Sequence, residues 1–493
     1  MNKFLQNIFI LLIFILSNLC SSIIVLPFKT YTEQEPSQFT SPSDIFKYWS
    51  KNIIYTNALI GTPPQNISII LNSQSYSTSI FNHMCDIPLS FYEKEKSSSY
   101  IFEKNINSYS TMSNASLIKE TLYLYTELNT KEYTPINSLY LIYSQNLKED
   151  QGKTYQYHPY TCMNLGLQMG WTYMNDYQAN FITQLRKKLN KIETYDFTLE
   201  YLTNTEGRII IGNEPHFYDE NKYSELQYRI SGAVDNRGSN QRDFFLNFDS
   251  INLHYTKNGK ERNDSIPMTK SAKIVIDMGM ILGPKEYKEN IDRLFFKDLK
   301  KNGKCKEEEI EDKNIYFYYC DKTLAENDIK NNFPDLFFEM KQFHKTFILT
   351  YEDLFRVKND RIYFLIYFRN YNFGNYFELG KIFLQKYSFT FNQETKMIGY
   401  YNFDLPGGKN EIKGDTTSTD EQNKEKKYFD NIHVVWLGTS AIVIGFAALG
   451  FLIGKLVYDK VRKRRINEVD DDNYYYNSQQ NNEDNKLCDN TDE

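Results

Sequence analysis

Two short turns in this chain carry the side chains that could do acid–base chemistry. One apolar run ends in LNSQS (Leu71–Ser75) and another ends in IDMGM (Ile276–Met280). Each turn is followed further along the chain by a stretch that contains Leu-Gly, NLGL and FELG respectively. This repeat indicates two similar halves that place Asn72 and Asp277 at equivalent points. A carboxylate can act as a base at ordinary pH, whereas an amide cannot.

Other reactive arrangements are not found in the sequence. The six histidines are dispersed without the spacing of metal ligands, so we expect no metal and no cofactor. The serine-rich stretch Asn72–Ser79 lacks the G-x-S-x-G pattern of a nucleophilic serine turn. Basic residues are scattered and the net charge is -6, so we expect no nucleic-acid partner.

The elements that must position these turns read as strands. Short β-branched and aromatic runs, separated by Gly, Asn, Asp and Pro, predict a mainly antiparallel β protein. Such runs are NISIIL (66–71), GRIIIG (207–212), KIVID (273–277) and YSFTFN (387–392). Helical spacing of apolar residues predicts helices in two segments, Asn180–Ile192 and Lys285–Leu299.

Six stretches follow one another in an informative order. They are YTNALIGTPPQNISIIL (Tyr55–Leu71), FYEKEKSSSY (Phe91–Tyr100), YSTMS (Tyr109–Ser113), GRIIIGNEPHFYD (Gly207–Asp219), IVIDMGMILGPKEY (Ile274–Tyr287) and FELGKIFLQKYSFTFNQETKMIGYYN (Phe377–Asn402). In this order they resemble the pepsin-like aspartic proteases, peptidase family A1, over nearly all of residues 53–403. The resemblance implies an all-β, mainly antiparallel, two-lobed acid-protease fold with few short helices.

The resemblance also assigns roles to residues. In the family two aspartates share one proton, because like charges so close cannot both ionise. Asn72 stands at the first aspartate position and Asp277 at the second. Tyr109 falls at the flap tyrosine, which would close over a bound peptide. Met278 and Met280 replace the threonines that flank the second catalytic turn.

Further departures from the family pattern reduce the prospect of catalysis. Ser73 keeps a hydroxyl, but Gln74 replaces a glycine and Lys381 replaces the aspartate after the final Leu-Gly. Loss of a positioned acid–base group typically costs about 10² to 10⁴ in rate. We therefore expect a degenerate dyad, with Asp277 retained as a structural residue.

Cysteines and sequons indicate the secretory pathway. Four cysteines fall between the two apolar segments described below: Cys85, Cys162, Cys305 and Cys320. Their even number favours two disulfides in an oxidising compartment. Proximity in sequence predicts Cys305–Cys320, where the family often has a disulfide, and leaves Cys85 for Cys162. The N-x-S sequons predict glycosylation at Asn66, Asn114 and Asn263.

The two ends of the chain predict membrane anchoring. Lys3 and the short apolar run 8–19 are typical of a secretory signal peptide. Residues 434–454 are uncharged and long enough to span a bilayer, and Lys and Arg residues follow them directly. We expect a single-pass type I membrane protein with an extracellular or lumenal N-terminal part and a cytosolic C-terminus. The predicted domains are a signal peptide (1–22), an N-terminal lobe (23–218), a C-terminal lobe (219–404), a polar stalk (405–433), a transmembrane helix (434–454) and a cytosolic tail (455–493).

Three functional hypotheses remain open from the sequence. The first is a non-catalytic, monomeric relative that binds a peptide or protein segment in the cleft between the lobes. The second is an active membrane-anchored aspartic endopeptidase that uses Asp277 with an unusual partner. The third is a surface structural or adhesion protein for which the fold is a scaffold.

Overall fold

The computed structural model describes residues 23–31, 41–73, 75, 77–81, 92–106, 112–126, 129–147, 162–167, 180–232, 244–257, 259–310, 314–369 and 375–405. Contacts divide the chain into two units, 1–412 and 413–493, and every described residue belongs to the first. The predicted signal peptide, transmembrane segment and tail, and the stalk beyond Leu405, lie outside the described residues. Within that described part, no helix is long and apolar enough to cross a membrane.

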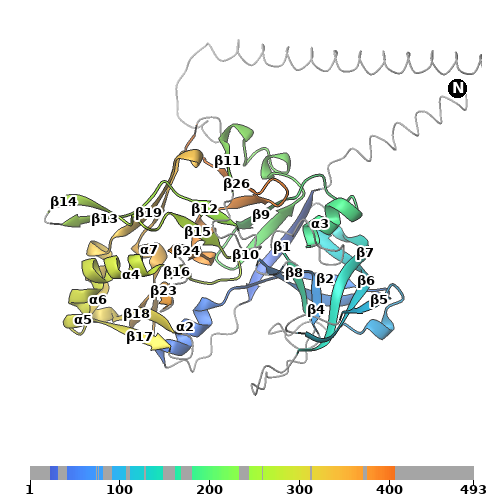
Figure 1. Cartoon of the computed structure of the whole chain (residues 1–493), viewed down its shortest axis with the longest axis horizontal. Helices are drawn as coiled ribbons and strands as arrows, with labels where there is room; N and C mark the ends of the chain where they lie inside the picture. Colours follow the sequence, from blue (N-terminus) through green and yellow to red (C-terminus); the bar gives the residue numbers. More distant parts are fainter. Residues whose placement is uncertain are drawn as a thin grey trace, which may run out of the picture. The chain divides into compact units, whose positions relative to one another are not determined.

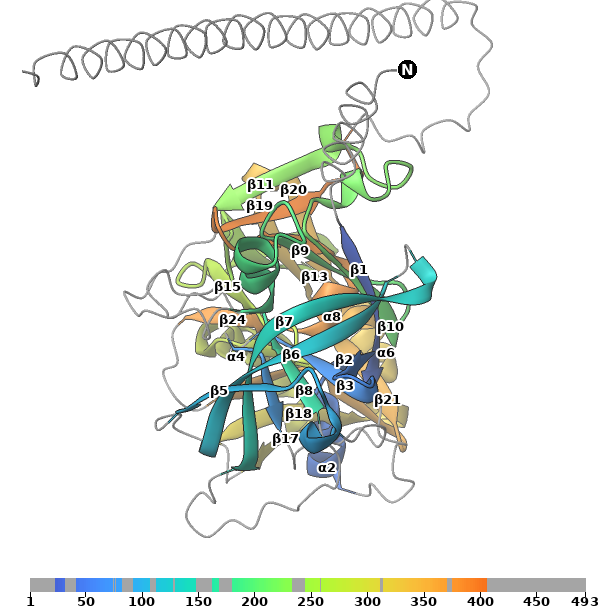
Figure 2. The ribbon, with the colours of Figure 1, turned by 90° about the vertical axis from the view of Figure 1, so that its right-hand side faces the viewer.

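The largest sheet has 13 strands and joins the N-terminal half of the chain to its last strands. Figure 2 shows three of its strands side by side: β5 (Ile101–Ile106), β6 (Met112–Thr126) and β7 (Asn129–Leu147). In spatial order the strands are β11 (Tyr228–Gly232), β26 (Met397–Tyr401), β25 (Phe389–Asn392), β9 (Asp196–Tyr201), β10 (Glu206–Ile211), β1 (Ile24–Tyr31), β2 (Ile53–Ile60), β3 (Gln65–Asn72), β8 (Cys162–Gly166), β4 (Ser79–Phe81), β7 (Asn129–Leu147), β6 (Met112–Thr126) and β5 (Ile101–Ile106).

Two further sheets are built from the C-terminal half (Figure 1). The first runs β12 (Phe245–Asn247), β15 (Ser271–Ile274), β24 (Tyr376–Leu379), β16 (Ile281–Gly283), β23 (Ile366–Arg369), β18 (Ile315–Asp321), β22 (Arg361–Phe364) and β21 (Phe355–Lys358), with β17 (Cys305–Ile310) paired to β18. The second runs β14 (Lys260–Ser265), β13 (Ser250–Lys257), β19 (Asp335–Met340) and β20 (Lys345–Leu349). The described part is therefore mainly β and contains both antiparallel and parallel pairs.

The helices are few and short. They are α2 (Pro42–Ser50), α3 (Phe181–Thr183) with a π-helical continuation (Gln184–Lys188), α4 (Lys285–Ile291), a π-helical segment (Asp292–Phe296), α5 (Lys297–Lys301), α6 (Lys322–Asn332), α7 (Tyr351–Leu354) and α8 (Lys381–Lys386). Single 3₁₀ turns lie at Lys94–Lys96, Pro215–Phe217, Glu225–Gln227 and Lys341–Phe343.

The strand and helix predictions are confirmed in position and differ at their ends. The runs 66–71 and 207–212 lie in β3 and β10, and the helix predicted from Lys285 continues to Lys301. The run 273–277 stops being a strand at Ile274, because the chain turns there toward Asp277. The helix predicted from Asn180 is helical from Phe181 to Lys188, with the Asn180 side chain capping its first turn.

Aromatic side chains fill much of the core, as the abundance of Tyr and Phe in the sequence suggests. The chain of buried rings includes Phe338, Phe347, Phe383, Phe389 and Tyr400, whose ring centroids lie 5.0 to 6.4 Å from a neighbouring aromatic ring. Offset and edge-on contacts at such distances add to the stabilisation that comes from burial alone. The core therefore runs without interruption from the C-terminal half into the strands that end the large sheet.

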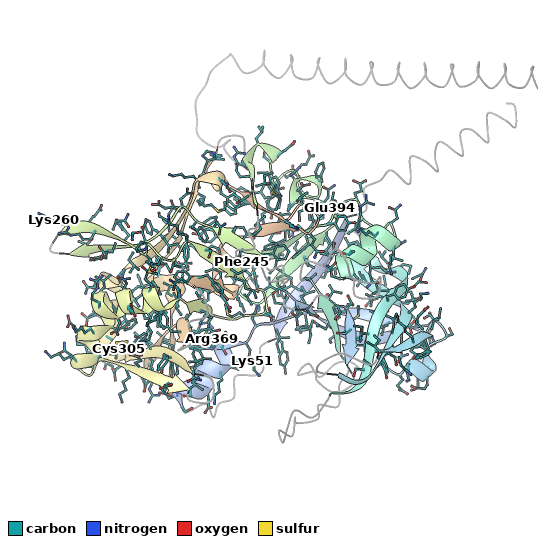
Figure 3. All side chains as sticks on the ribbon, in the orientation of Figure 1. Lys51, Phe245, Lys260, Cys305, Arg369 and Glu394 are labelled. Carbon is teal, nitrogen blue, oxygen red and sulfur yellow. A yellow bond between two sulfur atoms is a disulfide. The ribbon has the colours of Figure 1, made fainter. Side chains whose placement is uncertain are left out.

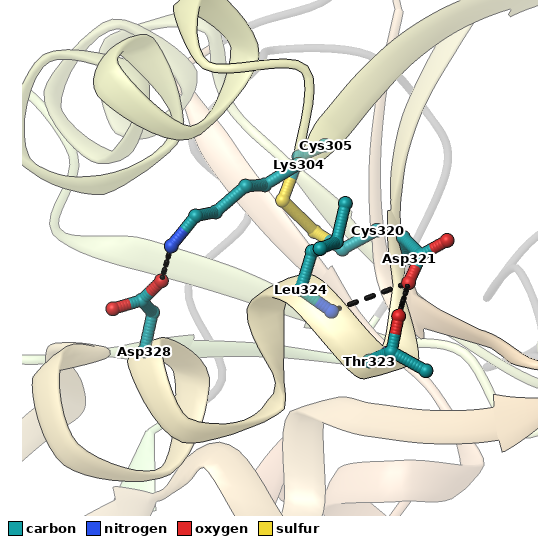
Figure 4. Close-up of a disulfide and its surroundings, with 7 residues drawn as sticks. All are labelled: Lys304, Cys305, Cys320, Asp321, Thr323, Leu324 and Asp328. Atoms are coloured by element: carbon teal, nitrogen blue, oxygen red, sulfur yellow. Dashed lines mark hydrogen bonds and ion pairs between the residues drawn. A yellow bond between two sulfur atoms is a disulfide. The ribbon is translucent and has the colours of Figure 1, made fainter.

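The disulfide between Cys305 and Cys320 is present, which confirms one of the two predicted pairings (Figure 4). It joins opposite residues of β17 and β18 in the register of that hairpin. Asp321, next to Cys320, caps α6 by accepting hydrogen bonds from Thr323 and Leu324. The second predicted pair is untested, since Cys85 and the side chain of Cys162 lie outside the described residues.

Candidate catalytic centre

The repeat seen in the sequence is a repeat in space. In the first half β3, which ends at Asn72, pairs in parallel with β8, so that Asn72 faces Gly166. In the second half β15, which leads to Asp277, pairs in parallel with β24, so that Ile274 faces Leu379. Each turn therefore lies against the strand that leads into the Leu-Gly stretch.

The glycines of these stretches are required by the closeness of the turns. A Cβ atom on Gly166 would lie 2.7 Å from the backbone nitrogen of Ser77, and one on Gly380 would lie 2.4 Å from the carbonyl oxygen of Met278. Backbone hydrogen bonds hold the contact in both halves, from Leu167 to the Asn72 carbonyl and from Lys381 to the Met278 carbonyl, at 2.9 and 2.8 Å. The two turns are thus supported in the same way.

Asn72 acts as a turn residue. Its Oδ1 accepts a hydrogen bond of 2.9 Å from the backbone nitrogen of Ser75, which is the pattern of an asparagine that stabilises a turn. The amide carries no charge and cannot exchange a proton with water at ordinary pH. The first half of the site is therefore ordered but supplies no acid or base at this position.

Ser73 joins the two turns directly. Its Oγ donates to Asp277 Oδ1 at 2.9 Å and accepts from the backbone nitrogen of Ile276 at 3.2 Å. The side chain of Ser73 is buried; its bond to Ile276 is buried and its bond to Asp277 is partly buried. Ser73 thereby holds the Asp277 carboxylate in place from the opposite half of the molecule.

Asp277 sits in an environment that disfavours its charge. Burial raises the pKa of this carboxyl above its ordinary value, and the hydrogen bond from Ser73 opposes part of that rise. A raised pKa is found in catalytic acids, but also in carboxyls that are simply enclosed. Here the position that would share its proton holds the amide of Asn72.

The chain's own N-terminal segment is hydrogen-bonded to the second turn. Lys51 and Met278 form an isolated antiparallel β-bridge. Beside it, the backbone nitrogen of Gly279 donates to the Ser50 carbonyl at 3.0 Å. Asn52 donates from its backbone to the Asp277 carbonyl and from its side chain to the Ile276 carbonyl, at 3.3 and 2.8 Å. Main-chain groups of this turn are therefore occupied by residues 50–52; Lys51 is labelled in Figure 3.

Helix α2 precedes this segment and packs on the C-terminal half. Ser41 caps its first turn, Pro42 starts the helix, and Ile45, Phe46 and Trp49 are buried. Phe46 stacks on Phe317 of β18 with ring centroids 4.6 Å apart. Figure 1 shows α2 beside β17 and β18.

The methionines of the second turn belong to the same cluster as α2. Met278 and Met280 are buried with Phe46, Trp49 and Tyr367 in a second apolar core. The hydroxyl of Tyr367 donates to the sulfur of Met278 at 3.3 Å, which is a weak hydrogen bond. The replacement of two threonines by methionines thus has a physical reason, because the longer apolar side chains pack beneath α2.

Lys381 lies close to the second turn, where the family resemblance expects an aspartate. Its backbone nitrogen binds the Met278 carbonyl, and its Nζ donates to Thr30 Oγ1 at 3.3 Å. Burial lowers the pKa of this ammonium group to about 8, and the nearby Arg356 adds to the effect. A cation that is costly to keep charged therefore lies beside the second turn.

Several predicted site residues are not placed or not tested by the structure. Tyr109 lies outside the described residues, between β5 and β6, which pair as an antiparallel hairpin. Asn66 and Asn263 are exposed, as a glycan would require, while the side chain of Asn114 is not among those described. Glycosylation at the three sequons stays a prediction.

Neither helix α2 nor the hydrogen bonds of Asn52 to the second turn were predicted from the sequence. The signal for α2 was available, because Ser-Pro-Ser-Asp followed by apolar residues at helical spacing is typical of a capped helix start. Nothing in the sequence could show that Asn52 donates to the turn that carries Asp277. That contact depends on how the N-terminal segment crosses to the C-terminal half.

A cavity of about 420 Å³ lies away from the two turns. It opens where β1 and β2 separate, and it is lined in part by Phe28, Lys29, Tyr55, Asn57 and Glu206. Neither Asn72 nor Asp277 contributes to it. In the described part of the chain, no three His, Cys, Asp or Glu side chains are grouped so that they could hold a metal ion.

Comparison with known proteins identifies the fold. No family model matches the sequence, and no curated protein matches it either. Among solved structures, basic 7S globulin from soybean is similar with a TM-score of 0.51 at 12% sequence identity. The match covers 77% of this chain and 95% of the soybean protein, which has a pepsin-like aspartic protease fold. The similarity supports that fold for this chain, in agreement with its mainly β architecture.

Proposed function

We propose that this protein is a membrane-anchored pepsin-like protein without protease activity, which binds extended peptide or protein segments. The observation that carries the proposal is the pair of turns joined through Ser73. The frame that would align two carboxylates is kept, while the first position holds the amide of Asn72, already hydrogen-bonded within its own turn.

The covering of the second turn also favours a non-catalytic role. A substrate strand needs free main-chain groups beside the catalytic residues, and residues 50–52 already bond to Asp277 and Gly279. Displacing them would also disturb the packing of α2 on Met278. An active endopeptidase therefore finds no specific support in this geometry.

An extended ligand has another strand to pair with. β5 ends the 13-stranded sheet, and Ile101 and Phe102 on it are about half exposed. Edge strands with exposed apolar side chains can accept an extended segment through main-chain hydrogen bonds. This strand belongs to the hairpin that the family resemblance identifies as the flap, so the ligand would lie on the flap side of the site.

The membrane part of the proposal comes from the sequence. The uncharged segment 434–454 and the basic residues that follow it support a single span with the C-terminus in the cytosol. The signal-like N-terminus supports entry into the secretory pathway, with the pepsin-like part extracellular or lumenal. We propose a monomer in the membrane, with no cofactor.

Matched peptide pairs test binding and the absence of a dyad together. One member of each pair carries a secondary alcohol in place of the central amide. The alcohol resembles the transition state, so a working dyad would bind it more tightly than the amide by a factor of about 10² or more. With the full chain in detergent, we expect both members to be retained with equal affinity. Binding of neither would refute the peptide-binding proposal, and a large preference for the alcohol would refute the loss of the dyad.

Two variants locate the site. Phe102→Ser should weaken both peptides about tenfold, because it removes an apolar side chain that the ligand would bury. Leu324→Ser on α6 is the matched control, since Leu324 is equally exposed but lies on a different element. Equal losses in the two variants, or no loss in Phe102→Ser, would exclude β5 as the binding strand.

A further inference from the structure

An apolar surface lies where the described chain ends. Four large apolar side chains are more than half exposed there: Phe217 (61%), Leu226 (69%), Ile230 (54%) and Phe403 (52%). We call these four residues the β11 patch. Exposed apolar residues that gather in one place mark an interaction surface, whereas single ones need no explanation.

The patch is contiguous because it rests on a network of aromatic rings. Tyr228 of β11 and Tyr401 of β26 face each other with ring centroids 4.7 Å apart, and Ile230 follows Tyr228 on the same face. Tyr223 joins Tyr401 to Phe403, at 4.7 and 6.0 Å. Figure 1 shows β11 and β26 side by side.

The remaining two members join the same network. The ring centroid of His216 lies 4.3 Å from that of Phe217 and 6.0 Å from those of Tyr228 and Tyr401. Leu226 precedes Gln227, whose carbonyl accepts from Asn402 and whose side chain donates to the Leu405 carbonyl. The patch is therefore built on rings and backbone that are held by the fold.

The charge around the patch is small and largely compensated. Lys222 pairs with Glu200, Lys345 pairs with Asp404, and Arg229 donates to backbone carbonyls. Burial lowers the pKa of His216, so this ring is neutral at physiological pH and can be covered without loss of a charge. An apolar, aromatic and weakly charged surface fits the boundary between lipid headgroups and acyl chains.

The position of the β11 patch indicates what covers it. Gln227, which follows Leu226, donates to the Leu405 carbonyl, and 28 residues lead from Leu405 to the apolar segment that starts at Val434. From its polar composition, a linker of that length is expected to span roughly 30 Å between its ends. The membrane surface is thus held within reach of this end of the molecule.

We propose that the β11 patch rests on the outer surface of the membrane that holds residues 434–454, in contact with zwitterionic lipid. This inference rests on the anchoring part of the proposed function and adds an orientation to it. Aromatic and leucine side chains anchor proteins at such interfaces. The contact fixes the pepsin-like part close to the bilayer.

Photo-crosslinking in lipid nanodiscs tests the contact with the full chain. A benzophenone amino acid replaces Leu226 or Phe403, and Met268 is the control because its side chain is 71% exposed and lies in the turn between β14 and β15. In phosphatidylcholine nanodiscs we expect lipid adducts at 226 and 403 at least about fivefold above the control.

Two results would overturn the inference. Adducts at 226 and 403 no more frequent than at 268 would place the patch away from lipid, and adducts to a second copy would make it a protein interface. Extraction of native membranes with alkaline carbonate separates this failure from failure of the anchor. A chain that stays in the membrane without lipid adducts refutes the patch contact alone, whereas a chain that is released refutes both proposals.

Discussion

Removal of the Ser73 hydroxyl should destabilise the protein in a way that depends on pH. Ser73→Ala deletes the bond to Asp277 and leaves the backbone nitrogen of Ile276 without its acceptor. A hydrogen bond to a charged group contributes about 1.5–3 kcal/mol, and a buried donor left unpaired costs about 1–3 kcal/mol. Allowing for relaxation of the turn, we expect a loss of about 2–4 kcal/mol near pH 7.5.

The sign of the pH dependence follows from the raised pKa of Asp277. A carboxyl whose pKa is higher in the folded state stabilises the fold at acid pH, and this contribution is lost as the pH rises through the folded value. Ser73 favours the charged form, so its removal raises that pKa further and harms the protein most when Asp277 is ionised. At about pH 3, below the ordinary aspartate pKa of 3.8, the bond is between neutral groups, and the loss should shrink by about 1 kcal/mol or more.

Urea unfolding of the full chain in detergent, at both pH values, measures the effect. Ser79→Ala is the matched control, because Ser79 is equally buried and its Oγ has no hydrogen-bond partner among the described residues. It should change stability little. In an Asp277→Asn background the Ser73 effect should no longer depend on pH. An equal loss at both pH values in the Asp277 protein would refute the reasoning, as would a loss no larger than that of Ser79→Ala.

Three further changes test contacts in other parts of the fold by the same urea measurement. Phe46→Ala should cost about 3–5 kcal/mol, because it empties the stack between α2 and β18; a cost below about 1 kcal/mol would mean that α2 is not docked. Arg208→Leu should cost about 3–5 kcal/mol, because it leaves the buried carboxylate of Glu200 with fewer partners. Burial alone would raise the pKa of Glu200, but hydrogen bonds lower it. The contribution of Glu200 to stability is therefore present at neutral pH and lost as the pH falls through the folded pKa. A cost of Arg208→Leu that does not diminish in acid would contradict this. Changing both Cys305 and Cys320 to serine opens a loop with a sequence separation of 15 residues and should cost about 3 kcal/mol, and no change would mean that the bond is not formed.

The strands around the two turns could be predicted because their signal is local. β3 and β10 are runs of β-branched residues that end at polar or glycine positions, and such runs have few alternatives to a buried strand. The repeated Leu-Gly stretch indicated two similar halves, whereas the parallel pairing of β3 with β8 and of β15 with β24 is known only from the structure. That stretch records a close approach which only glycine permits at Gly166 and Gly380.

The covering of the second turn could not be predicted, because it depends on contacts between distant parts of the chain. Phe46 and Met278 are over two hundred residues apart, and their packing follows from the path of the segment after β1. Periodicity could have given the helix but not the surface to which it binds. Likewise, the identity of Lys381 shows a departure from the family, whereas its burial and its bond to Thr30 are tertiary facts.

The role of the Ser73 hydroxyl could be predicted in part from the sequence. The family resemblance indicates that a hydroxyl in the first turn reaches across to the partner turn, and Ser73 does so. It donates to Asp277 and accepts from Ile276, and so it keeps the two halves in register although the pair of carboxylates is gone. The fold thus holds Asp277 against a first turn that carries the amide of Asn72.

Cleavage of a diverse peptide pool tests the central claim most directly. The purified full chain is incubated with the pool from about pH 3 to about pH 7, the range over which paired carboxylates exchange protons. Asp277→Ala and the double variant Asn72→Asp with Met278→Thr are run beside it. We predict no cleavage by the wild-type chain at any pH in this range. Cleavage by the wild-type chain that disappears in Asp277→Ala would contradict the account and establish an active protease.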